Sequence, residues 1–258
     1  MVTLQLDDVG AYYGKRLAVS GVSTPVMTAG EIVAVIGPNA AGKSTLFKRI
    51  AGLLKGPGQV RVNDSKKDKK AISYMPQDTS ANAVLTVYES ILLARKQGSA
   101  WSVDDDDLQL IDHVMAALNI VPIAFRDLGA LSGGQRQLVS VAQTLVREPD
   151  ILLMDEPTSA LDLRHQDEFM RTIREVAATD TIVVVILHEL GLAARMADRI
   201  AVLSEGRIVV EGPPEMAFTS GTLADVWGID ADVTVNARGT LHIDVLGPAR
   251  ARLSQEIG

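Results

Sequence analysis

The chain alternates between short apolar runs and longer stretches with helical periodicity. Four apolar runs occur, at 32–36, 151–154, 181–187 and 200–204. Runs of this length, separated by helical patterns, predict buried parallel strands joined by crossover helices. Residues from about 86 to 148 carry apolar positions almost entirely at helical spacing. The pattern therefore predicts an α/β fold with a mostly parallel central sheet and an inserted helical block.

Glycines divide the first part of the chain. Residues 3–36 contain short strand-like segments broken at Gly10, Gly14 and Gly30. Alternating segments punctuated in this way are typical of antiparallel strands. We expect an N-terminal antiparallel β portion that leads into the first buried strand.

The remaining segments complete a one-domain plan. A helix is predicted from Ser44 through Leu54, stopped by the segment Gly56-Pro57-Gly58, and residues 59–76 are strand-like. Residues 222–258 predict a short helix containing Trp227 and then a hairpin, because apolar and polar residues alternate there. We expect three parts: a core formed by residues 1–85 and 149–221, a helical subdomain at 86–148, and a C-terminal extension at 222–258.

Composition narrows the class of protein. A chain of 258 residues with 47% hydrophobic content can bury a large core. Its apolar runs are far shorter than the roughly 20 residues needed to span a bilayer, and its N-terminus lacks a basic-then-apolar signal pattern. We therefore expect neither a membrane span nor export. A net charge of -7 argues against a nonspecific nucleic-acid binder, and the absence of cysteine excludes disulfides and thiolate metal sites.

Two charge runs stand out. Lys66-Lys67-Asp68-Lys69-Lys70 lies between strand-like segments and is interpreted as a solvated turn. Asp104-Asp105-Asp106-Asp107 precedes an apolar pattern of helical period. Carboxylates in a first helical turn interact favourably with the helix dipole, so we favour that role over a metal site.

A phosphate-binding loop follows the first buried strand directly. Its sequence is Gly37-Pro38-Asn39-Ala40-Ala41-Gly42-Lys43-Ser44-Thr45. Glycines let the backbone wrap closely around phosphates, while amide groups and the following helix N-terminus point at the anion. In this pattern Lys43 reaches the β- and γ-phosphates and Ser44 can ligate magnesium. The sequence therefore predicts a nucleoside triphosphate with Mg²⁺.

Two further motifs carry a resemblance to a known family. They are Leu131-Ser132-Gly133-Gly134-Gln135 and Ile151-Leu152-Leu153-Met154-Asp155-Glu156-Pro157. With the phosphate loop and in this order, the chain resembles the ABC ATPases over about residues 3 to 246. The resemblance implies a P-loop NTPase core with an N-terminal antiparallel β portion and an inserted α-helical subdomain that holds the signature motif. It also implies ATP hydrolysis coupled to transmembrane transport.

The resemblance assigns catalytic roles to residues that follow buried strands. Asp155 ends one strand, where its carboxylate can hold Mg²⁺ through water. Glu156 matches the glutamate that polarises the attacking water, and His188 matches the switch histidine that contacts the γ-phosphate. Gln77, in Tyr74-Met75-Pro76-Gln77, resembles the glutamine that ligates Mg²⁺ and couples the helical subdomain to the core.

The resemblance also assigns contacts with ATP within one subunit. Tyr13 resembles the aromatic residue that stacks on adenine, although the adjacent Tyr12 is an alternative. The phosphate loop departs from the family at Ala40, where glycine is usual. If this position needs a positive φ, alanine costs about 1 kcal/mol; we expect ATP binding to be preserved. The expected ATP-binding set is Tyr13, Gly37, Asn39, Ala40, Ala41, Gly42, Lys43, Ser44 and Thr45.

A second copy of the chain would complete the site. In the family, the signature motif, here Ser132, Gly133, Gly134 and Gln135, binds the γ-phosphate held by the opposite subunit. The segment Ser159-Ala160-Leu161-Asp162 resembles the loop that couples the two sites, with Asp162 in the coupling position. Because one chain carries both halves, a homodimer with two equivalent sites is the simplest arrangement.

Within the family, two segments indicate a subgroup. Leu161-Asp162-Leu163-Arg164-His165-Gln166 and the tail containing Val226-Trp227-Gly228-Ile229 resemble the iron-siderophore, haem and cobalamin importer ATPases. This resemblance implies membrane-embedded permease subunits, an extracytoplasmic substrate-binding protein, and a peripheral position on the cytoplasmic face of the membrane. The alternatives are a soluble ABC ATPase in assembly or regulation, for instance of iron-sulfur clusters, and the detached ATPase of an exporter.

Overall fold

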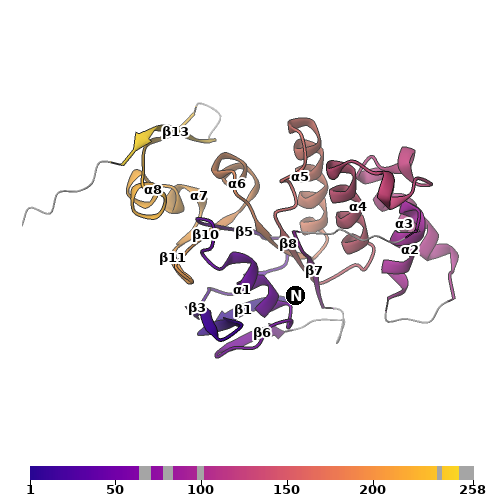
Figure 1. Ribbon diagram of the computed structural model, residues 1–258, viewed down its shortest axis with the longest axis horizontal. Helices are drawn as coiled ribbons and strands as arrows, with labels where there is room; N and C mark the ends of the chain where they lie inside the picture. Colours follow the sequence, from indigo (N-terminus) through magenta and orange to yellow (C-terminus); the bar gives the residue numbers. More distant parts are fainter. Residues whose placement is uncertain (64–70, 78–83, 98–101, 237–239, 250–258) are drawn as a thin grey trace, which may run out of the picture.

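A six-stranded sheet runs through the centre of the described part of the chain (Figure 1). The computed structural model describes residues 1–63, 71–77, 84–97, 102–236 and 240–249. All neighbouring strands are parallel except β10 and β11, the pair at one edge of the sheet. In spatial order the strands are β11 (Arg207–Gly212), β10 (Arg199–Ser204), β5 (Ile32–Ile36), β9 (Ile182–Ile186), β8 (Ile151–Asp155) and β7 (Ile72–Met75). The parallel sheet predicted from the four apolar runs is confirmed.

Both faces of this sheet are buried, which explains why its inner strands are continuous apolar runs. Val33 and Val35 pack into one core, together with Phe47 of α1 (Lys43–Ile50). Ala34 and Ile36 point the other way into a second core, which includes Phe169 of α5 (Leu163–Ala178). The second core also receives α6 (Leu190–Met196). The central sheet is therefore sandwiched between two hydrophobic layers.

The N-terminal strands form the antiparallel portion that the sequence predicts. One sheet joins β4 (Met27–Thr28), β1 (Thr3–Asp7) and β6 (Gln59–Asn63), and a hairpin joins β2 (Val9–Tyr13) to β3 (Arg16–Val22). The expected break at Gly10 is wrong, because Gly10 lies inside β2 and the chain turns at Asp8, with φ 50°. A Cβ at Gly10 would lie 2.7 Å from Cγ of Pro57, so this glycine permits a close approach.

Helix α1 is shorter than its apolar spacing predicts. It ends at Ile50, whereas the sequence predicts a helix through Leu54. Gly52 has φ 75°, a left-handed conformation that terminates helices readily in glycine. The side chain of Leu53 is 64% exposed, so its apolar character reflects no helical packing.

The region from 86 to 148 is helical, as predicted. It contains α2 (Val87–Lys96), α3 (Asp105–Ala117) and α4 (Gly133–Leu145), with two short 3₁₀ turns, Val121–Ile123 and Leu128–Ala130. Each long helix begins with a capping box, whose N-cap residues are Thr86, Asp104 and Ser132. Such boxes satisfy orphan amide groups in the first turn. Figure 1 shows these helices gathered at one end of the molecule.

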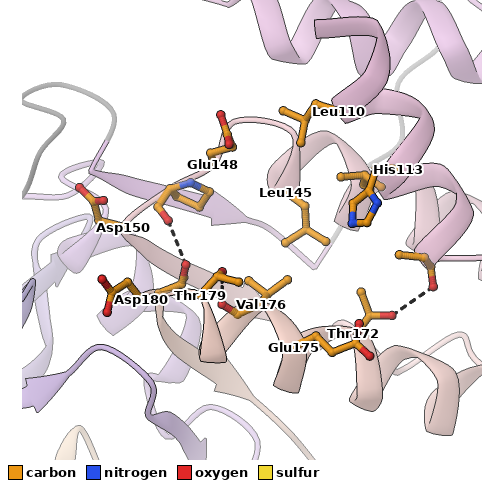
Figure 2. A pocket seen from close by; sticks show the side chains of 14 residues that line it. Leu110, His113, Leu145, Glu148, Asp150, Thr172, Glu175, Val176, Thr179 and Asp180 are labelled. Atoms are coloured by element: carbon orange, nitrogen blue, oxygen red, sulfur yellow. Dashed lines mark hydrogen bonds between the residues drawn. The ribbon is translucent and has the colours of Figure 1, made fainter. Parts of the chain in front are cut away.

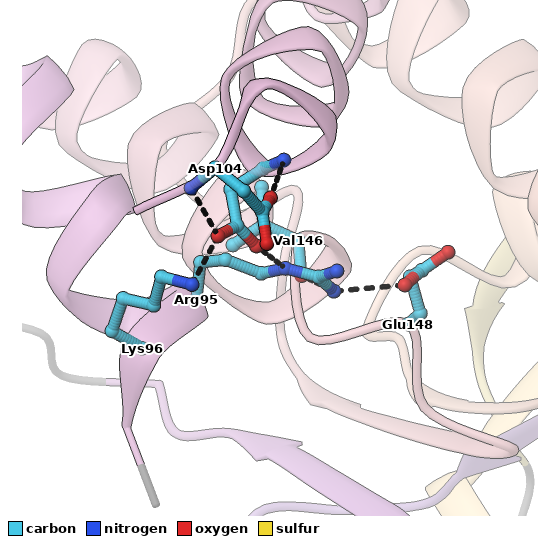
Figure 3. Close-up of polar contacts among 6 residues, drawn as sticks. Arg95, Lys96, Asp104, Val146 and Glu148 are labelled. Atoms are coloured by element: carbon cyan, nitrogen blue, oxygen red, sulfur yellow. Dashed lines mark hydrogen bonds and ion pairs between the residues drawn. The ribbon is translucent and has the colours of Figure 1, made fainter. Parts of the chain in front are cut away.

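The four aspartates have two roles. Asp104 caps α3, and Asp105 and Asp106 lie in its first turn, as the dipole interpretation predicts. Asp107 instead faces inward, where it pairs with Arg95 Nε at 2.8 Å and with Lys96 (Figure 3). Arg95 also donates to Val146 O and Glu148 Oε2, at 2.9 and 2.8 Å. This ion-pair network ties α2, α3 and the end of α4 together.

The C-terminal part is a helix followed by a hairpin, as the sequence predicts. After α7 (Pro214–Ala217), α8 (Ser220–Trp227) leads into β12 (Ile229–Val235), which pairs with β13 (Leu241–Pro248). Figure 1 shows this hairpin at the opposite end of the molecule from the helical block. The lysine run at 66–70 lies outside the described residues. Among the described residues, no helix has the length and apolar character to cross a membrane.

The ion-pair network predicts a pH dependence of stability. Hydrogen bonds from Lys96 and Arg95 hold the pKa of Asp107 below its usual range. A depressed folded-state pKa stabilises the fold above the unfolded pKa of about 3.9 and loses that contribution as pH falls further. Asp107→Asn should therefore lower Tm at pH 7, and the difference from wild type should shrink as the pH is reduced toward 3.

The control for this experiment is Asp105→Asn, which removes a neighbouring carboxylate that is exposed in the first turn of α3. It should change Tm little at any pH. A Tm difference for Asp107→Asn that is constant between pH 7 and 3 would contradict the assignment.

Candidate active site

The phosphate-binding loop turns sharply after β5 because two glycines allow it. Gly37 has φ 150°, and a Cβ there would lie 1.9 Å from the carbonyl oxygen of Leu203. Gly42 has φ 103° and precedes the first residue of α1. The loop therefore passes close to β10 and delivers the N-terminus of α1 to the carboxyl edge of the sheet. Helix N-termini in this position bind phosphate.

Ala40 occupies a left-handed conformation, with φ 62°. The cost of an alanine at this position depends on a positive φ, and the observed value lies in the left-handed range. The loop therefore carries strain of about 1 kcal/mol that glycine would avoid.

Lys43 lies at the base of the loop and is 6% exposed. Its Nζ donates to Gly37 O at 2.8 Å and to Pro38 O at 2.9 Å. Burial lowers the pKa of this ammonium group, and the nearby carboxylates of Glu156 and Asp155 oppose that change. The loop's own carbonyl groups thus hold the ammonium where phosphate oxygens could replace them.

Asp155 ends β8 and is 1% exposed. Tyr74 Oη donates to its Oδ2 at 3.2 Å, whereas its Oδ1 is buried with no hydrogen-bond partner among the described residues. Burial raises the pKa of Asp155, and the nearby hydroxyl groups of Ser44 and Tyr74 oppose the rise. A buried carboxylate oxygen without a donor, beside a serine hydroxyl, fits the oxygen ligands that Mg²⁺ prefers.

Glu156 is held at the mouth of the loop by several elements at once. Its backbone has φ 54°, an unusual value for a residue with a side chain. Its amide donates to Ile186 O of β9 at 3.2 Å, and Gln137 Nε2 of α4 donates to its carbonyl at 3.0 Å. Backbone strain of this kind persists only where the surroundings fix it and is common at functional sites.

The Glu156 carboxylate contacts two further residues that the sequence singles out. Gln77 Nε2 donates to Oε2 at 2.6 Å, and His188 Nε2 is hydrogen-bonded to Oε1. Gln77 follows β7 and His188 follows β9, so each reaches Glu156 from a different strand. The structure therefore gathers these three residues at the carboxyl edge of the sheet.

Gln77, Glu156 and His188 line one open cleft of about 730 Å³ together with the phosphate loop. Tyr13 lies on its wall with a side chain that is 68% exposed, whereas Tyr12 is not among the lining residues. An exposed aromatic face at such a wall could stack on a base. The lining consists of Tyr13, Arg16, Ala18, Asn39, Ala40, Ala41, Gly42, Lys43, Ser44, Thr45, Gln77, Glu156 and His188.

The signature motif does not line this cleft. Ser132 caps α4 through the amide of Gln135, and Gln135 returns the contact to the Ser132 amide. Gly134 packs against the next motif, because a Cβ there would lie 2.9 Å from Ala160 O. Asp162 caps α5 through the amide of His165 at 3.0 Å. Ser132 and Gly133 are exposed, so they are open to a partner molecule.

The sequence does not predict Arg16 and Ala18, which line the cleft, or Gln137 and Tyr74, which support its residues. Gln137 is 5% exposed and links α4 to Glu156, and Tyr74 supports Asp155. Gln137 lies on the buried face of α4 together with Ser140 and Thr144, and a long polar side chain among these positions is the available signal. Tyr74 lies two residues before the end of its strand-like stretch, with no signal beyond its position.

Together the fold and the cleft define a P-loop nucleotide hydrolase. A sequence model for the family described as ABC transporter matches residues 22–159. The hemin import ATP-binding protein of Thermobifida fusca (strain YX) is 36% identical over 236 residues, covering 88% of this chain and 82% of that protein.

Solved structures of ABC transporters are also similar to this chain. A structure described as an inward-facing ABC transporter of metal-chelate type is similar, with a TM-score of 0.81 at 26% identity, covering 95% of this chain and 97% of that one. A dimeric structure of a bacterial ABC transporter cassette has a TM-score of 0.72 at 25% identity, covering 82% and 98%. The chain belongs to the ABC transporter family and is one of its ATPase subunits, which confirms the resemblance and the fold class inferred from the sequence.

The left-handed Ala40 predicts a stabilising substitution. Ala40→Gly relieves the strain of about 1 kcal/mol, and the greater conformational freedom of glycine in the unfolded chain offsets about 0.4–1 kcal/mol of that gain. The free energy of unfolding, measured in urea, should therefore rise by up to about 0.6 kcal/mol.

Ala41→Gly is the matched control, because Ala41 is buried and does not have a positive φ. It should destabilise the protein by about 0.5–1 kcal/mol. If both variants lose stability equally, Ala40 does not occupy the left-handed conformation in solution.

Proposed function

We propose that this chain dimerises around ATP and hydrolyses it to power a bacterial importer for haem or a related metal chelate, such as an iron-siderophore or cobalamin. The observation that carries the ATPase mechanism is the placement of Glu156 between Gln77 and His188 at the mouth of the phosphate loop. Phosphoryl transfer depends chiefly on positioning of the attacking water and on charge stabilisation. Glu156 is the group that polarises this water.

The surrounding residues bind the triphosphate. Lys43 exchanges the carbonyl groups of its own loop for β- and γ-phosphate oxygens, and amides at the start of α1 donate to the same phosphates. Ser44, Gln77 and Asp155 would hold Mg²⁺, which would neutralise phosphate charge. His188 contacts the γ-phosphate, and Tyr13 stacks on adenine. The remaining loop residues, Gly37, Asn39, Ala40, Ala41, Gly42 and Thr45, complete the binding surface.

The signature motif supports a homodimer. Ser132 and Gly133 are exposed at the N-terminus of α4, a favourable location for an anion, yet they do not line their own chain's cleft. A second copy can bring this N-terminus to the γ-phosphate, with Gly134 and Gln135 beside it. Ala160 and Leu161, which directly precede Asp162, pack next to the same motif, and this supports a role of Asp162 in coupling the two sites.

An exposed aromatic patch supports docking of a membrane permease. Phe125 is 85% exposed and Val84 is 95% exposed. The Phe125 ring stacks on Tyr88 with centroids 6.3 Å apart. The first turn of α2 and the segment around Phe125 are joined by backbone hydrogen bonds; for example, Tyr88 N donates to Ala124 O at 2.8 Å. A rigid apolar surface on the helical subdomain is suited to a coupling helix of a permease and would place this subunit at the cytoplasmic face of the membrane.

The domain division and the choice of cargo complete the proposal. Residues 1–85 with 149–221 form the core, 86–148 the helical subdomain and 222–258 a C-terminal extension. The names of the hemin and metal-chelate relatives favour a metal-chelate cargo, which an extracytoplasmic binding protein would deliver. A soluble ABC ATPase in assembly or regulation and an exporter's ATPase remain the competing functions.

The dimeric ATPase predicts a trapped state in one variant. Glu156→Gln keeps the shape of the side chain but removes the base, so ATP should bind while turnover falls at least about a hundredfold. Light scattering should then show an ATP-dependent dimer. Unchanged hydrolysis would remove Glu156 from the mechanism.

The composite site is tested in the same background. Adding Ser132→Arg to Glu156→Gln places a bulky side chain at the interface and should leave ATP-bound monomers. Gln97→Arg, an exposed change at the end of α2, is the control and should leave the dimer intact. A dimer that persists with Ser132→Arg would rule out the ATP sandwich.

The permease proposal predicts the loss of a membrane partner. Purified from gently solubilised membranes of its own host, the wild type should retain a multi-span protein that mass spectrometry identifies. Phe125→Asp should lose this protein while keeping basal ATPase activity, because the ring contacts no residue of the cleft. The control Val235→Asp, at an exposed valine of the C-terminal hairpin, should retain it. Recovery of soluble partners alone would contradict transport and leave the ATPase intact.

A further inference from the structure

A second cavity, of about 480 Å³, is shown in Figure 2. It lies at the opposite edge of the sheet from the nucleotide cleft. Asp150 directly precedes β8 and Thr181 directly precedes β9, so this cavity, here called the junction pocket, faces the amino ends of the strands. Its other walls come from α3, α4 and α5. Its volume is within the range of small-molecule sites. The pocket therefore lies where the helical block meets the core.

The floor of the junction pocket is apolar. Figure 2 shows Leu110, Leu145 and Val176 pointing into the same space. The hydroxyl groups on its walls are already satisfied, because Thr172 donates to Ala117 O at 3.1 Å and Thr179 to Val176 O at 2.8 Å. These walls can therefore accept an apolar body without leaving donors unpaired.

The rim of the pocket carries negative charge. The lining residues include four carboxylates, Glu148, Asp150, Glu175 and Asp180, and no lysine or arginine. Glu148 is paired with Arg95. Glu175 and Asp180 are exposed at the rim, which leaves them available to a ligand. A cation would complement this charge.

Three helix dipoles add to the negative potential. The lining includes Ala117, the last residue of α3, Leu145, the last residue of α4, and Thr179, which caps the end of α5. The C-terminus of a helix carries about half a negative charge, and basic side chains commonly compensate it. The last turns of these three helices contain no basic residue, but Arg95 from α2 donates to Val146 O, the C-cap carbonyl of α4, and so compensates that helix end. Among the described residues, the ends of α3 and α5 therefore favour a cation independently of the rim carboxylates.

We propose that the junction pocket binds a small amphipathic cation, in which a primary ammonium or guanidinium group is carried on an aliphatic or aromatic body. The body packs on Leu110, Leu145 and Val176, and the charged head lies among the rim carboxylates. Because α3 and α4 belong to the helical block whereas α5 and the strands belong to the core, the ligand contacts both at once. Binding selects one orientation of the two parts and so regulates ATP turnover. This regulatory effect rests on the proposed ATPase function, whereas binding does not.

The test uses a matched series of probes and the full chain without nucleotide. Isothermal titration calorimetry compares 4-phenylbutylamine with 4-phenylbutyrate, which reverses the charge, and 4-phenylbutanol, which removes it. Butylamine, which lacks the aromatic body, completes the series. The phenylbutylamine should bind at least about tenfold more tightly than each of the others, and added salt should weaken its binding but not that of the alcohol. Equal affinities for amine and alcohol would overturn the proposal.

Variants locate the binding. Val176→Trp fills the floor and should weaken amine binding at least about tenfold, with folding checked by circular dichroism. Glu175→Gln with Asp180→Asn should weaken it about threefold to tenfold, the effect of two exposed charge contacts. The control, Asp230→Asn with Asp232→Asn, removes the same charge from exposed positions of the C-terminal hairpin and should change nothing. Full affinity in both pocket variants would place the ligand elsewhere and overturn the site.

Regulation has its own readout. The amine should change steady-state ATP turnover of the wild type by at least about twofold with half-effect near its Kd, and the Val176→Trp variant should not respond. An amine that binds in the pocket without changing turnover would overturn the regulatory effect alone. A chain without ATPase activity would contradict the proposed function and leave the calorimetric test of the pocket valid.

Discussion

The hydrogen-bonded register of three buried parallel strands is the constraint on which the site depends. Asp155 of β8 is aligned with Ile186 of β9, and Ile186 is aligned with Val35 of β5. The residues that follow each strand must therefore emerge along one edge. These are Gly37 with the phosphate loop, Glu156, and His188 beyond one more residue. Functional residues that are up to about 150 positions apart in the sequence are brought to one edge by backbone pairing. The side chains within the strands have only to bury both faces of the sheet.

Within this frame, Glu156 is fixed by its backbone as well as by its side chain. Its left-handed φ of 54° is maintained by a bond to β9 and by the Gln137 amide from α4. A rotation of α4 relative to the sheet must change this contact. Because α4 also begins at Ser132, the same helix joins the partner-facing motif to the catalytic carboxylate. The geometry makes the position of the helical block and the position of Glu156 mutually dependent.

Sequence patterns predict the features of this protein that arise from local chemistry or from continuous apolar runs. The phosphate loop, the strands of the inner sheet and the acidic first turn of α3 are of this kind. The turn at Asp8 is not, because its amide donates to Ser23 Oγ, 15 positions away. The end of α1 at Ile50 does have a local cause that the apolar spacing obscures, because the left-handed Gly52 closes the helix beside the bond from Leu53 N to Lys48 O. The role of Gln137 depends on a partner 19 positions away. Asp107 was interpreted from its neighbours in sequence, whereas its inward direction depends on Arg95 and Lys96 of another helix.

Helix α4 contacts Glu156 through Gln137 and ends at the junction pocket. The way in which its two ends can influence each other follows from the distance between them. The helix has 13 residues and therefore spans roughly 20 Å between the signature motif and the junction pocket. Its dipole favours an anion at one end and a cation at the other. At physiological ionic strength the screening length is about 8 Å, so charges at the two ends hardly interact through solvent. Any coupling between them must be mechanical, carried by α4 as a rigid element. Arg95 of α2 binds Val146 and Glu148 at the end of this helix and Asp107 of α3, so the three helices are tied together where α4 reaches the pocket.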